Sequence, residues 1–362
     1  MAGNMSDHSV SFSIRRTAYL DKHGTALAPL PDFAADVAAV QTLYQAMVLT
    51  RSFDAKAVAL QRTGRLGTYA SSLGQEAVAV GMASAMQPAD VLLPSFREHG
   101  AQLWRGVSML ELLQFWGGDE RGSDYRGPRQ DFPVCVPVGS QFPHAAGVAT
   151  AFALRAEPRV AVVAGGDGAT SKGDFYEALN VVGVWRLPAV FVISNNQWAI
   201  STPRARQSAA ETLAQKAIAA GMPGEQVDGN DVIAVRDAVD RALARVRVGD
   251  GGSLIECLTY RLADHTTSDD ASRYRDEAEV RAHWAQEPLL RLRSYLTQTG
   301  AWAQDDEAAL LRDCHDQVEA AAAAYLALAG DTAGSIFDNL YAELPDDLRD
   351  QRAAVLSASD HA

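Results

Sequence analysis

Three short apolar runs constrain the fold of this chain more than any other feature of its sequence. They span Arg159–Ala164, Ala189–Ser194 and Ser253–Leu258. A run without polar alternation is typical of a strand buried on both faces, and such strands belong to parallel sheets covered by helices. Amphipathic helical patterns lie between the runs, at 175–182 and 235–246. The sequence therefore predicts an α/β fold with three layers, a parallel sheet with helices on both faces.

Further helical patterns surround this core. Apolar residues from Phe33 to Met47 recur at helical spacing, which predicts a long helix that begins near Asp32. Other helices are predicted over residues 75–86, 108–116, 141–154, 280–300 and 305–328. We expect an N-terminal arm over 1–32, an α/β domain over 33–275 and a helical C-terminal extension of that domain over 276–362. The arm is expected to wrap a partner or the chain's own surface.

Charge and cysteine content exclude several classes of function. The chain has 32 Lys and Arg residues against 45 Asp and Glu residues, a formal net charge of −13. Nucleic acids and anionic membranes would repel it, so we expect neither as a partner, and a phosphate ligand needs local groups or a metal. Cys135, Cys257 and Cys314 include no C-x-x-C pair, which indicates reduced packing residues. Neither a run of about 18 apolar residues nor a secretory leader is visible, so a cytoplasmic location is expected.

Polar residues follow two of the predicted strands where each strand ends. Asp167 stands in a Gly-Asp-Gly turn after the first run, and Asn196 follows the second, 29 residues later. Ligands of open α/β sheets bind beyond the carboxyl ends of the strands. A carboxylate beside an amide oxygen suits Mg²⁺, which takes few protein ligands together with ligand phosphates. The glycines let the backbone approach a diphosphate, and the next helix directs its positive end there. Gly-Asp-Gly alone is most often a turn, but both elements at this spacing favour a magnesium–diphosphate site.

The same two elements resemble the thiamine diphosphate fingerprint, Gly-Asp-Gly followed roughly thirty residues later by Asn-Asn. The stretch from Gly166 to Thr202 is similar to the α subunits of heteromeric 2-oxo acid dehydrogenases, the decarboxylating components of the pyruvate and branched-chain complexes. The resemblance covers roughly residues 30–350 and includes GRLGTYASSLGQEA at 64–77, PSFREHG at 94–100, VGSQFPHAAG at 138–147, QVDGND at 226–231 and TYRLADHTTSDDASRYR at 259–275. It implies the diphosphate-binding domain of the thiamine diphosphate-binding fold.

The resemblance also implies which residues hold the metal and the diphosphate. It makes Asp167, Asn196 and the backbone carbonyl of Trp198 the Mg²⁺ ligands. It places the backbone of Gly168 and Ala169 against the diphosphate.

Four more residues are implied as cofactor contacts. Arg97 is expected to face the cofactor. Phe96 stands where the family often has Tyr, so a hydroxyl contact is missing here. Val136 and Val138 match backbone positions that face the aminopyrimidine.

A polar segment, Leu262–Tyr274, follows the third predicted strand without helical or strand periodicity, so it is expected to be a mobile loop over the same edge of the sheet. The resemblance assigns diphosphate binding to Arg261 and acyl transfer to a lipoyl arm to His265, whose imidazole is expected to titrate near neutral pH. Asp264 adds a negative charge before this catalytic histidine. Thr266 replaces a regulatory Ser of mammalian relatives, so kinase control is not supported. Among the other histidines, His144 and His283 are expected to be structural. The sequence does not assign a role to His99, which lies close to Arg97.

The resemblance implies a partner and a reaction. Thiamine enzymes need a Glu against the aminopyrimidine, and in this family it comes from a separate β subunit, so an α₂β₂ tetramer is expected. The implied function is that of a pyruvate dehydrogenase (acetyl-transferring) α subunit, which delivers the acetyl group to lipoamide on the dihydrolipoyl acyltransferase core. The alternatives are a branched-chain (2-oxoisovalerate) dehydrogenase α subunit and an acetoin dehydrogenase α subunit. A paralogue that only binds the cofactor is disfavoured, because it has no need to keep His265.

Overall fold

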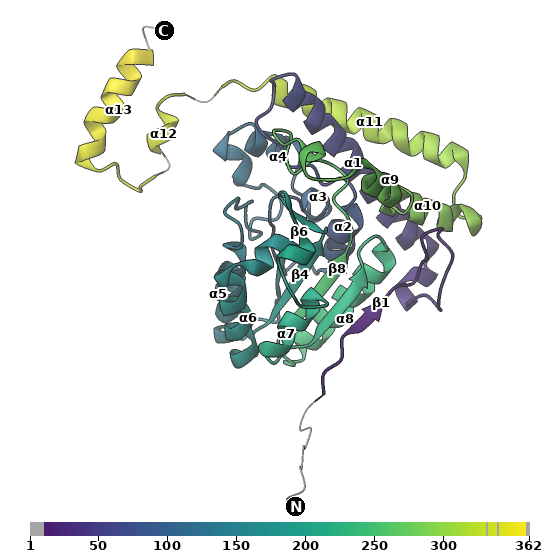
Figure 1. The fold of residues 1–362 in the computed structure, drawn as a ribbon. Coiled ribbons are helices and arrows are strands. Elements are labelled where there is room, and N and C mark those ends of the chain that lie inside the picture. Colours follow the sequence, from purple (N-terminus) through teal and green to yellow (C-terminus); the bar gives the residue numbers. More distant parts are fainter. Residues whose placement is uncertain (1–10, 331, 339, 360–362) are drawn as a thin grey trace, which may run out of the picture.

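The centre of the fold is a six-stranded parallel sheet (Figure 1). The computed structural model describes residues 11–330, 332–338 and 340–359. The strands of the sheet are β1 Arg15–Thr17, β2 Val91–Leu93, β3 Ala161–Gly166, β4 Ala189–Asn195, β7 Gly224–Asp228 and β8 Ser253–Leu258. They are ordered β1-β7-β8-β4-β3-β2, and every neighbouring pair is parallel. The predicted α/β fold is confirmed. The pattern predicts β3, β4 and β8 but not the other three strands, which are short or rich in polar residues.

Helices cover both faces of the sheet, as predicted. On one face, α2 Glu76–Ala85 and α8 Val232–Arg247 pack against side chains such as Val162 and Val190. On the other face, α5 Gln141–Leu154 and α6 Gly173–Trp185 pack against residues such as Phe191. The remaining α-helices before residue 250 are α1 Val37–Arg62, α3 His99–Arg105, α4 Met109–Trp116 and α7 Lys216–Ala219. The alternation of side chains along each strand supplies both interfaces.

An outer group of helices packs over α2 on the side away from the sheet. It comprises α1, α10 Pro288–Gln298 and α11 Gln304–Leu326, whose apolar residues share one core cluster. The prediction of a single helix over 280–300 is wrong, because α9 Glu277–Trp284 ends before α10 begins. Pro288 opens α10, where its missing N–H costs nothing, and the Glu287 carboxylate caps the backbone amides of the first turn. The proline is therefore a helix start and not an interior residue.

The described part of the N-terminal arm lies on the chain's own surface. β1 extends the sheet by pairing with β7. The Asp231 carboxylate, at the start of α8, accepts hydrogen bonds from the backbone amides of Tyr19 and Leu20, both at 2.7 Å. Of the two positions expected for the arm, the described residues take the one against the chain itself.

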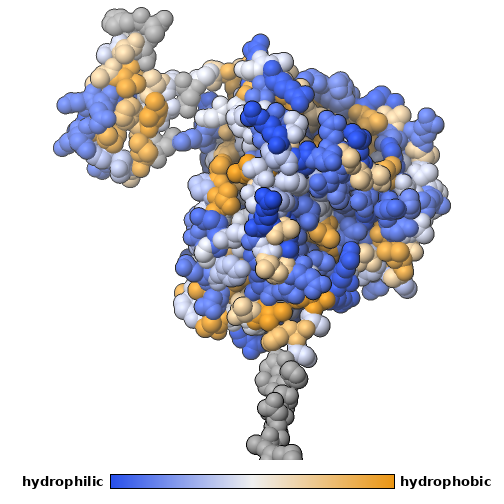
Figure 2. All heavy atoms as spheres, viewed as in Figure 1, coloured by the Kyte–Doolittle hydropathy of each residue, from blue (hydrophilic) through white to orange (hydrophobic). Residues whose placement is uncertain are grey.

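The C-terminal helices α12 Ser335–Asp338 and α13 Asp346–Ser359 stand apart from the body of the molecule (Figure 1). Apolar side chains gather on one side of this segment (Figure 2), and Ile336, Leu340 and Tyr341 are exposed. Across the described ranges, no helix combines the length and the apolar character needed to cross a membrane.

Candidate active site

The residues implied by the resemblance converge on one cavity at the carboxyl ends of β3 and β4. Its volume is about 530 Å³. The predicted site residues in its lining are Phe96, Arg97, Val136, Val138, Asp167, Gly168, Ala169, Asn196, Trp198 and His265. Arg261 does not line this cavity, although it donates hydrogen bonds to four residues that do, Asn196, Trp198, Ile200 and His265. Cys135 also lines it and is only half-buried, so the prediction of a packing role is wrong for this cysteine.

Asp167 and Asn196 end neighbouring strands and both face this cavity. β3 and β4 pair in register, so residues that directly follow them meet at one edge. Asp167 is 2% exposed and begins the short 3₁₀ helix Asp167–Ser171. Burial raises the pKa of its carboxyl group, and the Gln207 side-chain amide, which donates at 2.9 Å, opposes that rise. In the residues that the structure describes, Asp167 has no Lys, Arg or His within ion-pair distance. A buried carboxylate in this position is suited to a metal cation.

The turn around Asp167 leaves room only for glycine at the next position. A Cβ on Gly168 would lie 2.5 Å from the Cβ of Ala199, closer than two carbon atoms can approach. The absence of a side chain also exposes the backbone of this turn to the cavity. This arrangement fits a diphosphate held by backbone groups.

The buried side chains of Arg97 and Arg261 form a cluster with His265. This cluster lies beside Asp167 and Asn196, the predicted metal ligands. Arg97 Nη2 donates to His265 Nδ1 at 2.9 Å and to the His265 carbonyl at 2.5 Å. Arg261 Nη1 donates to His265 Nδ1 at 3.3 Å. Because Nδ1 accepts from guanidinium groups, the proton of the neutral ring sits on Nε2. Among the described residues, neither guanidinium has a carboxylate within ion-pair distance, so the cluster is suited to an anion.

The expectation that His265 titrates near neutral pH is wrong. Burial, together with the positive charges of Arg97 and Arg261, lowers the pKa of His265 to about 4. The ring is therefore neutral at pH 7 and donates only through Nε2–H.

The Arg261 guanidinium lies against the segment that follows β4. Its guanidinium donates to the carbonyls of Trp198 at 3.3 Å and Ile200 at 2.8 Å, and to the Tyr274 hydroxyl at 2.9 Å. The Trp198 carbonyl, implied as a metal ligand, is thus engaged by Arg261.

The segment Leu262–Tyr274 lies over the cavity and is held by its own side chains. The Asp269 carboxylate accepts from the His265 backbone amide at 2.9 Å and from the Tyr274 hydroxyl. The Asp264 carboxylate accepts from the backbone amide of Ala271 at 3.1 Å. Asp264 does not line the cavity, so its charge supports the loop and does not face the site.

Phe96 and the two valines form the apolar part of the wall. The Phe96 ring lies edge-on to the His265 imidazole, with 6.0 Å between the ring centroids. Val136 and Val138 are 54% and 47% exposed, so they border the open side of the cavity.

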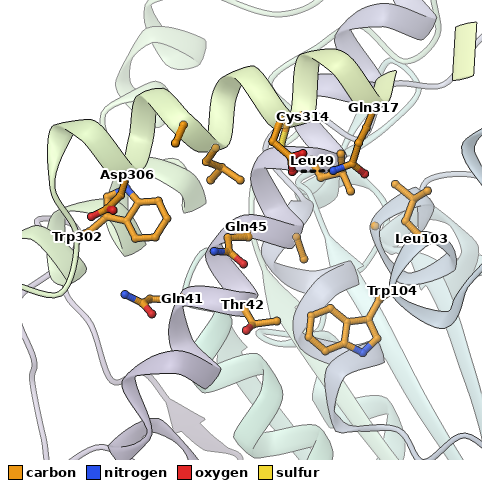
Figure 3. A pocket seen from close by; sticks show the side chains of 15 residues that line it. Gln41, Thr42, Gln45, Leu49, Leu103, Trp104, Trp302, Asp306, Cys314 and Gln317 are labelled. Atoms are coloured by element: carbon orange, nitrogen blue, oxygen red, sulfur yellow. Dashed lines mark hydrogen bonds between the residues drawn. The ribbon is translucent and has the colours of Figure 1, made fainter. Parts of the chain in front are cut away.

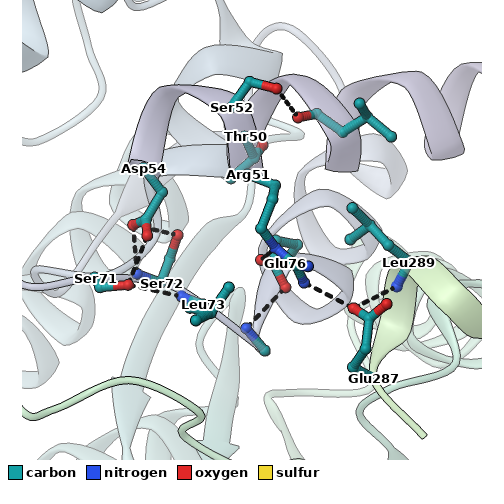
Figure 4. A network of polar contacts seen from close by, with 12 residues as sticks. Thr50, Arg51, Ser52, Asp54, Ser71, Ser72, Leu73, Glu76, Glu287 and Leu289 are labelled. Atoms are coloured by element: carbon teal, nitrogen blue, oxygen red, sulfur yellow. Dashed lines mark hydrogen bonds and ion pairs between the residues drawn. The ribbon is translucent and has the colours of Figure 1, made fainter. Parts of the chain in front are cut away.

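A buried hydrogen-bond network around Asp54 fixes residues 69–75, the segment from which Ala70 and Gln75 line the cavity (Figure 4). The Asp54 carboxylate on α1 accepts from the hydroxyls of Tyr69 at 3.0 Å and Ser71 at 2.6 Å and from the backbone amide of Ser72 at 2.7 Å. The Ser71 carbonyl in turn accepts from Arg97 Nη1 at 2.6 Å.

His99 belongs to the same network and not to the cavity. Its Nε2 accepts from the Trp116 indole N–H at 3.0 Å, so Nδ1 carries the proton and donates to the Tyr69 hydroxyl at 3.2 Å. His99 is fully buried and burial lowers its pKa to about 4. The role left open by the sequence is therefore structural.

Sequence reasoning misses three residues that support the site. These are Asp54, Gln75 and Gln207. Gln75 is buried, lines the cavity and accepts a hydrogen bond from Asn196. A glutamine before an apolar helix is indistinguishable from an ordinary helix start, and Gln207 lies in an irregular segment. Only Asp54, a charge within the apolar stripe of a helix, carries a signal that periodicity could have detected.

A second cavity, of about 710 Å³, lies between α1, α3 and α11 (Figure 3). It is lined by Gln41, Gln45, Trp104, Trp302, Cys314 and neighbouring residues. Its two carboxylates, Asp306 and Asp313, come from α11, and no histidine, lysine or arginine joins them in the lining. The predicted chemistry therefore belongs to the first cavity.

Known proteins resemble this chain over most of its length. The dehydrogenase E1 component family matches residues 44–326. The 3-methyl-2-oxobutanoate dehydrogenase subunit alpha of Mycobacterium tuberculosis is 43% identical over 311 residues, which cover 86% of this chain and 84% of that protein. The pyruvate dehydrogenase E1 component subunit alpha of Staphylococcus aureus is 39% identical, with 85% of this chain and 84% of that protein covered. The protein of the same name from Acholeplasma laidlawii is 40% identical, with 85% and 90% covered.

Proposed function

This chain belongs to the dehydrogenase E1 component family as the α subunit of a 2-oxo acid dehydrogenase, and on that premise we propose that it acts in the thiamine diphosphate-dependent oxidative decarboxylation of pyruvate. The acetyl group passes to lipoamide on an acyltransferase core. The observation that carries the proposal is the meeting of Asp167 and Asn196 in one cavity. The guanidiniums of Arg97 and Arg261, which lack carboxylate partners among the described residues, lie at the same site.

The residues present fit a magnesium–diphosphate group. Asp167, the Asn196 amide oxygen and the Trp198 carbonyl would hold the metal, and the backbone of Gly168 and Ala169 would bind the diphosphate. Gln75 lines the cavity and its buried amide nitrogen has no hydrogen-bond partner, so this residue has an unused donor. When bound, thiamine diphosphate supplies the carbanion chemistry of decarboxylation.

His265 is proposed as the catalytic residue of acyl transfer. Its Nε2–H is the proton that the ring offers to the cavity, because the two arginines occupy the Nδ1 side. The Leu262–Tyr274 loop, stabilised by Asp269, keeps this donor in place and excludes water from the reacting groups.

A second chain completes the proposed site. The described residues contain one large sheet, and the glutamate that the aminopyrimidine requires is assigned to a β subunit in an α₂β₂ tetramer. Val136 and Val138 border the open side where such a chain would cover the cofactor. The test is to assay the purified chain with pyruvate and an artificial electron acceptor, without and with its β subunit. Turnover by the α chain alone would contradict the proposal.

The unpaired thiols of Cys257 and Cys314 support a cytoplasmic location for this complex.

Two observations support a second candidate substrate, a branched-chain 2-oxo acid. The Mycobacterium tuberculosis relative at 43% identity is a 3-methyl-2-oxobutanoate dehydrogenase subunit, and the cavity wall formed by Phe96, Val136 and Val138 is apolar. The α₂β₂ enzyme should be assayed with pyruvate and with 3-methyl-2-oxobutanoate. A higher kcat/KM for pyruvate supports the first proposal, and a higher value for the branched-chain acid replaces it with the second.

A further inference from the structure

Gln75 touches Asn196, one of the two residues on which the proposed site depends. It stands at the start of α2 and is 4% exposed, with its side chain in the lining of the cavity. Its Oε1 accepts a hydrogen bond from Asn196 Nδ2 at 2.9 Å. The resemblance assigns no role to Gln75, and the proposed function uses only its unpartnered donor.

The hydrogen bonds of Asn196 determine how the Gln75 amide is oriented. Asn196 Oδ1 accepts from the backbone N–H of Trp198 at 3.2 Å, so the amide nitrogen of Asn196 is the atom that faces Gln75. An amide nitrogen only donates, and Gln75 must therefore present its oxygen. The nitrogen of Gln75 is then on the other branch of the side chain. It is buried and has no hydrogen-bond partner.

The backbone that carries Gln75 is fixed on both sides (Figure 4). Before it, the Asp54 carboxylate holds Ser71 and Ser72. After it, the buried Glu76 carboxylate accepts from the Gly74 amide at 3.0 Å and pairs with Arg51 at 2.5 Å. Arg51 also pairs with Glu287 at 2.8 Å. The backbone on both sides of Gln75 is therefore anchored by buried contacts, and Gln75 lines the cavity with a buried amide nitrogen that has no partner.

We infer that Gln75 has two roles at the proposed cofactor site. It is a positioning residue, because its oxygen fixes the amide of Asn196 so that Oδ1 is presented to the metal. It is also a binding residue, because its nitrogen donates to an anionic oxygen of the bound diphosphate. A buried donor without a partner is costly, and an acceptor brought in by the ligand removes that cost. This inference rests on the proposed function.

Two substitutions separate the roles. Gln75→Met keeps the length of the side chain and removes both hydrogen-bonding groups. Gln75→Glu keeps an oxygen for Asn196 and replaces the donor by a second oxygen, which repels a diphosphate. Gln102→Met is the matched control. Gln102 is also buried with one unpartnered amide atom, but it donates to the Tyr125 hydroxyl and does not line this cavity.

The measurements use the α₂β₂ enzyme stripped of cofactor. Calorimetry gives the affinity for thiamine diphosphate at saturating Mg²⁺, and electron paramagnetic resonance gives the affinity for Mn²⁺ at a diphosphate concentration that saturates each variant. Loss of a residue that orients a metal ligand typically costs 10–100-fold in metal affinity. Gln75→Met should weaken both affinities by roughly that factor. Gln75→Glu should weaken thiamine diphosphate binding at least as much, without weakening Mn²⁺ binding. Gln102→Met should change neither.

Each contrary result overturns a defined part of the inference. Unchanged Mn²⁺ affinity in Gln75→Met refutes the positioning role. Unchanged thiamine diphosphate affinity in Gln75→Glu refutes the donor role. If the unaltered enzyme binds no thiamine diphosphate with Mg²⁺, the proposed function fails and the inference fails with it. If the unaltered enzyme and both Gln75 variants bind equally well, only the inference fails.

Discussion

Removing the Asp54 carboxylate should destabilise the chain more than any single substitution on the exposed face of α1. Asp54 is 3% exposed and holds the segment 69–75, which contributes to the cavity lining. In Asp54→Ala, the Tyr69 hydroxyl and the Ser72 backbone amide lose their acceptor, and both residues are fully buried. The Ser71 hydroxyl can rotate, so it does not become a fixed donor without an acceptor.

The expected magnitude follows from these two donors. Each buried donor left without a partner costs about 1–3 kcal/mol, so Asp54→Ala should cost about 2–6 kcal/mol. Asp54→Asn keeps one oxygen and loses the charge, and it should cost about 1–2 kcal/mol. Ser52→Ala is the control on the same helix. Its hydroxyl donates to the Val48 carbonyl of its own helix, so its effect should stay within about 0.5 kcal/mol.

Thermal unfolding of the three variants tests this order. Asp54→Ala should lower Tm by roughly 4 °C or more, with Asp54→Asn between it and the control. Because the Ser71 carbonyl also holds Arg97, Asp54→Ala should weaken thiamine diphosphate binding as well. An Asp54→Ala protein that unfolds at the same temperature as Ser52→Ala would show that the network contributes nothing to stability.

Three further predictions concern the proposed site. Asp167→Ala should abolish Mg²⁺-dependent thiamine diphosphate binding, because the diphosphate loses its neutralising cation, and calorimetry showing unchanged affinity would refute the metal assignment. Because the pKa of His265 falls to about 4 in the folded chain against 6.5 for an ordinary His, the unfolded chain takes up a proton first as pH falls. The stability contributed above pH 6.5 is therefore lost between about pH 6.5 and 4, and urea titrations of His265→Gln should show a shallower loss over that range. His265→Ala should reduce acetylation of a lipoyl domain by ~10²–10⁴-fold but reduce decarboxylation with an artificial acceptor far less, and equal losses would instead indicate a role in cofactor binding or loop order.

The sequence predicts the sheet better than the details of the site. Continuous apolar runs predict β3, β4 and β8, since burial on both faces leaves a strong signal. β1 has no such signal: its residues Arg15–Thr17 are polar, and their position depends on β7, more than two hundred residues away. Tertiary pairing of this kind cannot be derived from a local pattern.

Within the site, too, features that depend on local motifs are predictable from the sequence, and features that depend on long-range contacts are not. Asp167 and Asn196 are predictable because strand ends meet at one edge of a parallel sheet. The neutral state of His265 is not, since it depends on Arg97 from a segment 168 residues earlier. The Gln75 contact with Asn196, across 121 residues, is hidden for the same reason.

The strand at the edge of the sheet has a consequence for synthesis of the chain. β1 leaves the ribosome well before its partner β7, which ends at Asp228, and the Thr17 hydroxyl donates to Glu225 across 208 residues. At a synthesis rate of roughly 5–20 residues per second, β1 is made about 10–40 s before the residues of β7 with which it pairs. During that time its unpaired backbone N–H and C=O groups are available to pair with other strands, so native pairing of this segment depends on synthesis of β7.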